Sequence, residues 1–173
     1  MESCSPLICK TPSGASPPAP SVHLCPTCGQ RTKKVKRLTM EHLLLPGAIP
    51  QIGNTQYYFC ETPTCSVVYF PYDTSAAEFH KADLRVRVGV KETEEPVPLC
   101  NCFGITRKEV WDEIENTGKT TVAGRIKAEV QAGNCACEVK NPSGKCCLGN
   151  VTRAVQEGME TIRSLATAGR TRG

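Results

Sequence analysis

The stretch QYYFCETPTCSVVYF, residues 56–70, decides how the first half of the chain folds. Its two outer parts are rich in aromatic and β-branched side chains, which favour β-strands. The segment between them contains a proline and has a cysteine at each end, Cys60 and Cys65, as is typical of a short connection between strands. The stretch therefore predicts a β-hairpin that carries two thiols at its tip.

A second pair of thiols precedes the hairpin in Cys25-Pro-Thr-Cys28, which gives the spacing Cys-x2-Cys-x31-Cys-x4-Cys together with Cys60 and Cys65. Two residues between thiolates let both sulfur atoms reach one ion, and four thiolates complete a tetrahedral site. Such a closed site has no open position for a substrate water, so we expect it to hold a structural Zn²⁺. Iron in the same Cys4 site and a pair of redox-active disulfides are the alternatives.

Three histidines, His23, His42 and His80, are the other candidate ligands in this region. We expect each of them to lie on the surface, because four thiols already complete the site. The basic run at residues 33–37 also lies here, and we interpret it as a solvated face.

The composition excludes several classes of protein. The chain has 173 residues with 21 Lys plus Arg against 17 Asp plus Glu, a net charge of +4, which is too small to indicate a nucleic-acid partner. It contains no apolar run of about 18 residues and no secretory signal, so we expect no membrane span and a cytoplasmic location. Twelve cysteines in a reducing compartment indicate metal or redox chemistry rather than structural disulfides.

Residues 1–22 predict a disordered amino-terminal segment that ends in a linker rich in proline and serine. Cys4 and Cys9 lie at its start, where the linker would make them a mobile pair of thiols. The alternative is a tail with two idle thiols.

The composition changes at residues 91–98, which are acidic and contain proline, and this change predicts a domain boundary. Residues 23–92 are then a β-rich zinc-binding subdomain, with a short helix at residues 39–45 and a further strand at residues 84–90. Residues 93–173 are a helical subdomain, in which apolar periodicity and capping signals predict helices at about 107–116, 121–132 and 149–167. The expected fold class is α+β.

A second set of cysteines lies in the helical part. Cys100 and Cys102 stand just before the Thr106 capping box, and a group of four (Cys135, Cys137, Cys146, Cys147) precedes the last helix. Helix amino termini favour thiolates, and a [2Fe-2S] cluster needs four of them. A cluster or a second zinc therefore fits this set, and we favour the cluster.

These motifs resemble a known arrangement. Cys-x-Cys-Phe-Gly at residues 100–104 and Asn-Pro-Ser-Gly-x-Cys-Cys at residues 141–147 resemble the iron–sulfur half of copper chaperones of the CopZ type, which is itself similar to bacterioferritin-associated ferredoxin (BFD). The Cys25–Cys28 knuckle and the strand-forming residues 57–60, 67–70 and 85–89 resemble the zinc-binding part of the same proteins.

The resemblance implies a BFD-like [2Fe-2S] subdomain with Cys100, Cys102, Cys137 and Cys147 as cluster ligands. Cys135 and Cys146, each near one of these, are the alternatives for the last two positions. The four cysteines outside both sets are candidate soft-metal thiols: Cys4, Cys9, Cys135 and Cys146. The chain lacks the Met-x-Cys-x-x-Cys carrier domain that such chaperones contain.

The predicted function is that of a metallochaperone or metal-handling redox protein. It would bind a soft ion, copper or mercury, reduce Cu(II) to Cu(I) and carry Cu⁺ to a metal-transporting ATPase or another metal-resistance protein. The alternatives are a BFD-like electron carrier with a structural zinc and a zinc-ribbon interaction module. No motif typical of an enzyme active site is present, so the only catalysis we expect is metal-ion reduction by electron transfer.

Overall fold

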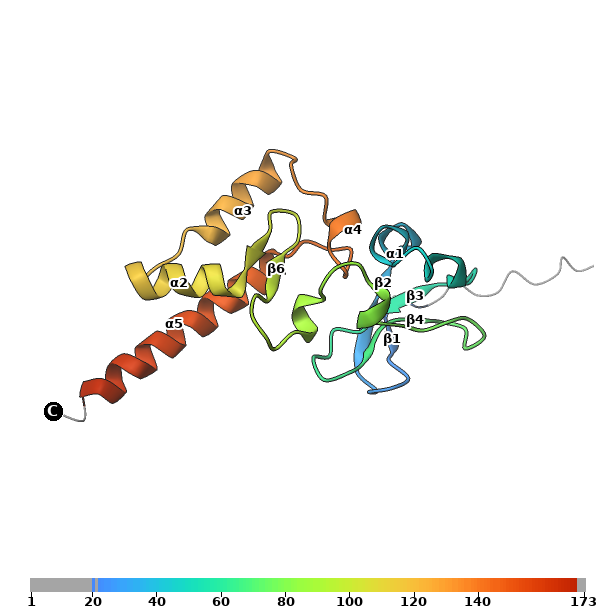
Figure 1. Ribbon diagram of the computed structural model, residues 1–173, viewed down its shortest axis with the longest axis horizontal. Helices are drawn as coiled ribbons and strands as arrows, with labels where there is room; N and C mark the ends of the chain where they lie inside the picture. The colour runs from blue at the N-terminus through green and yellow to red at the C-terminus, as the bar shows by residue number, and fades with distance from the viewer. Residues whose placement is uncertain (1–19, 21, 171–173) are drawn as a thin grey trace, which may run out of the picture.

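The computed structural model describes residue 20 and residues 22–170, except for the side chains of residues 165–170 (Figure 1). Cys4 and Cys9 therefore lie outside the described residues. The first half forms one antiparallel sheet whose strands follow in chain order: β1 (Val22–Leu24), β2 (Arg31–Val35), β3 (Tyr57–Phe59), β4 (Val67–Pro71) and β5 (Phe79–His80).

The hairpin expected at residues 56–70 is confirmed as β3 and β4, with Tyr57 opposite Pro71 and Phe59 opposite Tyr69. Every residue of both strands is buried, because both faces of the hairpin are covered. On one face the sheet packs against helix α1 (Arg37–Leu43) through Met40 and against the following Leu44. The opposite face packs against the side chains around Cys25, Cys60 and Cys65. This two-sided burial explains why each of these strands is a continuous apolar run and does not alternate between apolar and polar residues.

The prediction of a strand at residues 84–90 is wrong. Leu84 forms only an isolated bridge with Leu44, and short 3-10 helices lie on either side: η2 (Lys81–Asp83) and η3 (Gly89–Lys91). The guanidinium of Arg85 donates to the Leu44 carbonyl, and that of Arg87 donates to the carbonyls of Glu94 and Pro96. These bonds satisfy loop carbonyls, while Leu84 and Val88 still enter the core of the sheet.

The second half contains a two-stranded hairpin and four helices. They are β6 (Pro98–Cys100), β7 (Ile105–Thr106), α2 (Arg107–Thr117), α3 (Val122–Gln131), α4 (Cys137–Lys140) and α5 (Leu148–Arg170). The three expected helices are present as α2, α3 and α5. The Thr106 hydroxyl accepts a hydrogen bond from the Glu109 amide at 3.2 Å, and Gly118 ends α2 with φ of +75°.

Helices α2 and α3 both pack on the long helix α5 (Figure 1). Their contact is an apolar core that includes Val110, Ile114, Ile126 and Val151. The indole N–H of Trp111 also donates to the Ala154 carbonyl at 3.0 Å. None of the described helices has the length and apolarity that crossing a bilayer requires.

The sheet subdomain contacts the helical half at several points. Helix α1 packs against α4, and the buried hydroxyl of Tyr69 in β4 donates to the Pro142 carbonyl at 2.7 Å. Gly144 lies so close to α1 that a Cβ there would be 2.8 Å from the Thr39 Oγ1 atom. The segment between α4 and α5 is therefore held by the sheet subdomain.

Gly89→Ala is expected to destabilise the protein by about 2–3 kcal/mol, because a Cβ at Gly89 would overlap the carbonyl oxygen of Pro98 in β6. Urea unfolding measures the change. Gly124→Ala is the control, because a Cβ there meets nothing within 4 Å and helix α3 should gain up to about 1 kcal/mol. Equal stability of the two variants would contradict the close approach of η3 to β6.

Candidate metal centres

The first four thiols come together at one end of the sheet. Cys25 and Cys28 lie in the turn between β1 and β2, and Cys60 and Cys65 lie in the connection between β3 and β4. All four sulfur atoms are within 4.8 Å of one another. The Sγ–Sγ distance is 3.9 Å for Cys25 and Cys65, and 3.7 Å for Cys28 and Cys60. A tetrahedral ion with metal–sulfur bonds of about 2.3 Å places its ligands about 3.8 Å apart, so these thiols form a Cys4 metal site.

Local backbone hydrogen bonds turn both cysteine-containing segments toward the site. The Gly29 amide donates to the Cys25 carbonyl at 2.8 Å, and Gly29 adopts φ of +67°, which a glycine reaches without strain. In the second segment, the Cys65 amide donates to the Thr62 carbonyl at 3.2 Å. The two turns therefore place both pairs of sulfurs at the same end of the sheet.

The thiols of this site differ in acidity. A hydrogen bond with the Thr62 hydroxyl lowers the pKa of Cys28 to about 6, while burial raises the pKa of Cys25 to about 12 and also raises that of Cys65. Cys28 is thus ready to bind as a thiolate, whereas the buried thiols must release protons when the ion enters. Metal affinity should therefore fall as the pH is lowered.

Lys91 supports the site and was not predicted from the sequence. Its side chain is buried, and its ammonium donates to the carbonyls of Thr62 at 2.7 Å and Cys65 at 3.0 Å. In the sequence, Lys91 opens an acidic, proline-containing segment, where a lysine normally lies in solvent. Only the folding of η3 against the hairpin tip brings it here.

Lys91→Met is expected to accelerate zinc release. The variant keeps most of the buried volume but leaves two carbonyls at the hairpin tip without a donor, which costs about 1–3 kcal/mol for each group left unsatisfied. Transfer of zinc to a chromophoric chelator measures the rate, with Lys127→Met on the exposed face of α3 as the control. Equal rates in the two variants would show that Lys91 does not hold the tip.

The second set of thiols does not converge on one point as the Cys4 thiols do. Cys102, in the turn between β6 and β7, lies 3.6 Å from Cys137, the first residue of α4. Cys100 and Cys147 are both buried and share a hydrogen bond, which lowers the pKa of Cys100 to about 6 and raises that of Cys147. Within residues 22–170, no second set of three or more such ligand atoms lies as close together as the Cys4 site.

Backbone N–H groups point at sulfur atoms in both pairs. The amides of Cys102 and Phe103 donate to Cys100 and help to lower its pKa. The Cys147 amide donates to Cys137, although burial still raises the pKa of Cys137 to about 12. Cys100 and Cys102 stand just before Thr106, which caps α2 as expected, but the short strands β6 and β7 also hold them in a hairpin turn. Their amide donors come from this turn.

The remaining cysteines and the histidines lie outside these sets. Cys135 is half-buried and Cys146 is exposed, and neither belongs to either pair. His42 and His80 are on the surface as expected. His23 differs, because it is half-buried and its ring packs 5.2 Å from those of Tyr58 and Tyr72.

Comparisons with known proteins agree with the first site. Residues 22–85, which contain the Cys4 site, match the family zf_CopZ, described as a zinc binding domain. The chain is 37% identical over 134 residues to the copper chaperone CopZ of Archaeoglobus fulgidus. The match covers 75% of this chain and 60% of the relative, so the chain spans less than two thirds of that protein.

A solved structure extends the similarity into the helical half. The X-ray structure of the Archaeoglobus fulgidus CopZ N-terminal domain superposes with a TM-score of 0.62 at 36% sequence identity, and the match covers 76% of this chain and 96% of that domain. The chain therefore belongs to the family of the CopZ N-terminal domain.

Proposed function

We propose that this protein is a metallochaperone for Cu(I), with a structural zinc in its Cys4 site and a [2Fe-2S] cluster on Cys100, Cys102, Cys137 and Cys147. The observation that carries the proposal is that these last four thiols lie near one another without closing into one tetrahedral set: Cys102 lies beside Cys137, and Cys100 beside Cys147. Each iron of a [2Fe-2S] cluster takes two thiolates, whereas a second zinc would draw all four sulfurs into one tetrahedron. When bound, the cluster supplies a single electron, as the reduction of Cu(II) to Cu(I) requires.

The residues around the two pairs suit such a cluster. The amides of Cys102, Phe103 and Cys147 donate to cysteine sulfurs, and amide donors of this kind stabilise negative charge on a cluster. Cys100 and Cys147 are buried and limit the access of water, while Cys102 and Cys137 are only half-buried. The half-buried pair is therefore the side through which an electron would leave most directly.

The sheet subdomain contributes by fixing the segment that connects the two pairs. Tyr69 and Thr39 both lie against residues 142–144, between Cys137 and Cys147. In addition, the Asn101 side chain donates to the Lys140 carbonyl at 3.0 Å, which links the turn of Cys102 to α4. These contacts help to position the segment that carries Cys137 and Cys147.

Copper is proposed as the cargo because the curated relative is a copper chaperone. Soft thiolates select Cu(I), and Hg(II) would bind the same thiols. Cys146 is the exposed thiol among the described cysteines, and Cys4, Cys9 and Cys135 are the further candidates. A metal-transporting ATPase or another metal-resistance protein is proposed as the receiver.

A second candidate is an electron carrier with a structural zinc. It is favoured by one observation: Cys135 and Cys146 belong to neither of the two pairs, so the described residues hold no ready-made soft-metal pair outside the proposed centres. The two candidates differ in whether Cu(I) stays on the protein after an electron has been transferred.

The test starts from protein that is purified without oxygen, reduced with dithionite and desalted. One equivalent of Cu(II) is expected to restore the visible absorption of the oxidised protein and to yield one equivalent of Cu(I), which the protein retains against a weak chelator. If the spectrum returns but all Cu(I) passes to the chelator, the protein is an electron carrier. A spectrum unchanged by Cu(II) would contradict the reductase proposal.

A further inference from the structure

The side chain of Tyr69 reaches from the sheet to the segment between Cys137 and Cys147. Tyr69 lies in β4 and is fully buried, and its hydroxyl donates to the Pro142 carbonyl at 2.7 Å, across 73 positions of the sequence. Pro142 is buried as well, and a buried carbonyl without a donor is unfavourable. The Tyr69 hydroxyl therefore holds Pro142 against the sheet.

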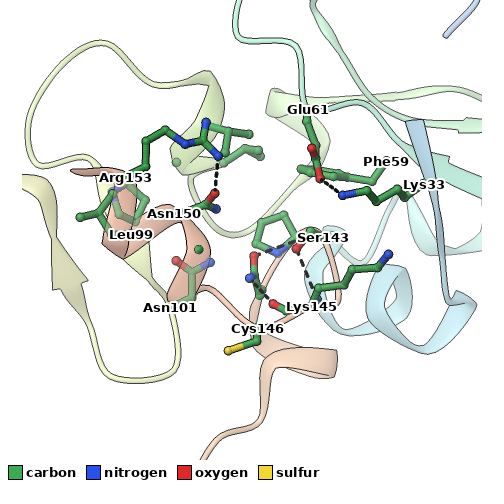
Figure 2. A pocket seen from close by; sticks show the side chains of 17 residues that line it. Lys33, Phe59, Glu61, Leu99, Asn101, Ser143, Lys145, Cys146, Asn150 and Arg153 are labelled. Carbon is green, nitrogen blue, oxygen red and sulfur yellow. Dashed lines mark hydrogen bonds and ion pairs between the residues drawn. The ribbon is translucent and has the colours of Figure 1, made fainter. Parts of the chain in front are cut away.

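The turn that contains Pro142 is closed by its own hydrogen bonds. The Asn141 side chain accepts from the Ser143 amide at 3.4 Å and donates to the Lys145 carbonyl. The Gly144 amide donates to the Asn141 carbonyl at 2.7 Å. The Lys145 amide donates to the Ser143 hydroxyl at 3.3 Å, and Figure 2 shows this bond. Because the turn is closed in this way, a displacement of Pro142 is passed on to the cysteines that follow.

The last of these cysteines contributes to the proposed cluster site in two ways. Cys147 is itself a proposed ligand, buried beside Cys100, and its backbone amide donates to the sulfur of Cys137. Hydrogen bonds to sulfur are among the factors that set the reduction potential of an iron–sulfur cluster, because a donor stabilises the negative charge that reduction adds. The position of the turn therefore bears on the potential.

We propose that Tyr69 is a positioning residue for the [2Fe-2S] cluster: its hydroxyl holds Pro142 so that the Cys147 amide stays directed at the Cys137 sulfur. The inference rests on the proposed function, because it requires the cluster. It makes the reduction potential of the helical half depend on a side chain of the zinc-binding sheet. Without the hydroxyl, the turn moves away from the sheet, the N–H···S bond lengthens and reduction becomes less favourable.

The test compares Tyr69→Phe with Tyr57→Phe in the full chain, purified without oxygen, after iron and zinc have been measured. Tyr57 is the matched control, because it is buried in the neighbouring strand and belongs to the same apolar core. Its hydroxyl accepts from the Gly53 amide at 3.0 Å, within the sheet subdomain. Each substitution removes one buried, hydrogen-bonded hydroxyl, so both variants should lose similar stability in urea.

A redox titration followed by visible absorption separates the two variants. Tyr69→Phe is expected to keep one zinc and two irons and to lower the equilibrium constant for reduction about ten-fold, which moves the midpoint potential about 59 mV more negative. Its visible circular dichroism should change as well, because that signal reports on the geometry around the cluster. Tyr57→Phe should leave the potential and the dichroism unchanged.

Gly144→Ala tests the same turn without altering the core of the sheet. A Cβ at Gly144 would lie 2.8 Å from the Thr39 Oγ1 atom, so the turn must move away from α1, and the potential should shift in the same direction as in Tyr69→Phe. Gly118→Ala is its control, because φ is +75° there, against +65° at Gly144, but a Cβ meets nothing within 4 Å.

Two results would overturn this inference alone: potentials that stay unchanged in both Tyr69→Phe and Gly144→Ala, or an equal shift in Tyr57→Phe. In either case the cluster and the copper function remain as proposed. Absence of iron from the unsubstituted protein, by contrast, would refute the proposed function itself.

Discussion

Cys60→Ser is expected to remove the zinc and to unfold the five-stranded sheet. Cys60 is fully buried, lies 3.7 Å from Cys28 and belongs to the core that covers one face of the hairpin. Structural zinc in small domains contributes about 10–16 kcal/mol of binding free energy, more than such a sheet could otherwise supply. Zinc analysis combined with near-ultraviolet circular dichroism, which reports on the packing of its tyrosines, measures the loss.

The unfolding should also reach the helical half. Once the sheet is lost, Tyr69 no longer holds the Pro142 carbonyl and α1 no longer packs against α4, so the segment between Cys137 and Cys147 loses its support. We therefore expect the visible absorption of Cys60→Ser to decline together with the zinc content. Cys135→Ser, which changes neither the Cys4 site nor a proposed cluster ligand, is the control. Retention of full iron by a variant that has lost its sheet would show that the two halves are independent.

Cys147→Ser is expected to prevent cluster assembly, while Cys146→Ser leaves it unchanged. The two cysteines are neighbours in sequence, but Cys147 is buried beside Cys100, whereas Cys146 is exposed. Serine offers a hard, weakly acidic hydroxyl in place of a soft thiolate, so one iron would lose half of its protein ligands.

The measurement is the iron content and the visible spectrum of both variants, purified without oxygen under the same conditions. Zinc should stay at one equivalent in both, because the Cys4 site is separate. An intact spectrum in Cys147→Ser together with a lost spectrum in Cys146→Ser would show that Cys146, and not Cys147, is the cluster ligand.

Much of the fold could be predicted from the sequence where the signal is local. The β3–β4 hairpin was visible because both strands are buried on two faces and therefore read as apolar runs. Helix α2 was visible because a threonine caps its start and a glycine with positive φ ends it. In both cases the decisive residues are close together in the chain.

The features that were missed depend on distant partners. Strand β2 (Arg31–Val35) was not predicted. The basic run at residues 33–37 was interpreted only as a solvated face, and its overlap with a strand whose pairing with β1 and β3 buries Thr32 and Val35 was missed. The alternation of Arg87 with its valine neighbours imitates a strand, but its guanidinium binds loop carbonyls nearby. No pattern within a few residues could have shown either outcome.

In the candidate sites, too, local features could be predicted and long-range features could not. The spacing of Cys25, Cys28, Cys60 and Cys65 was enough to predict the Cys4 site, because a closed thiolate set needs only four sulfurs. The supporting role of Lys91 could not be predicted, because it depends on the packing of η3 against a hairpin tip about 30 residues earlier in the chain.

The most direct test of the account is the metal content of protein purified without oxygen from cells supplied with iron and zinc. We expect one zinc, two irons and two acid-labile sulfides per chain. We also expect a red-brown colour, and a paramagnetic-resonance signal of one unpaired electron per chain after reduction. Colourless protein with two zinc ions and no iron would contradict it.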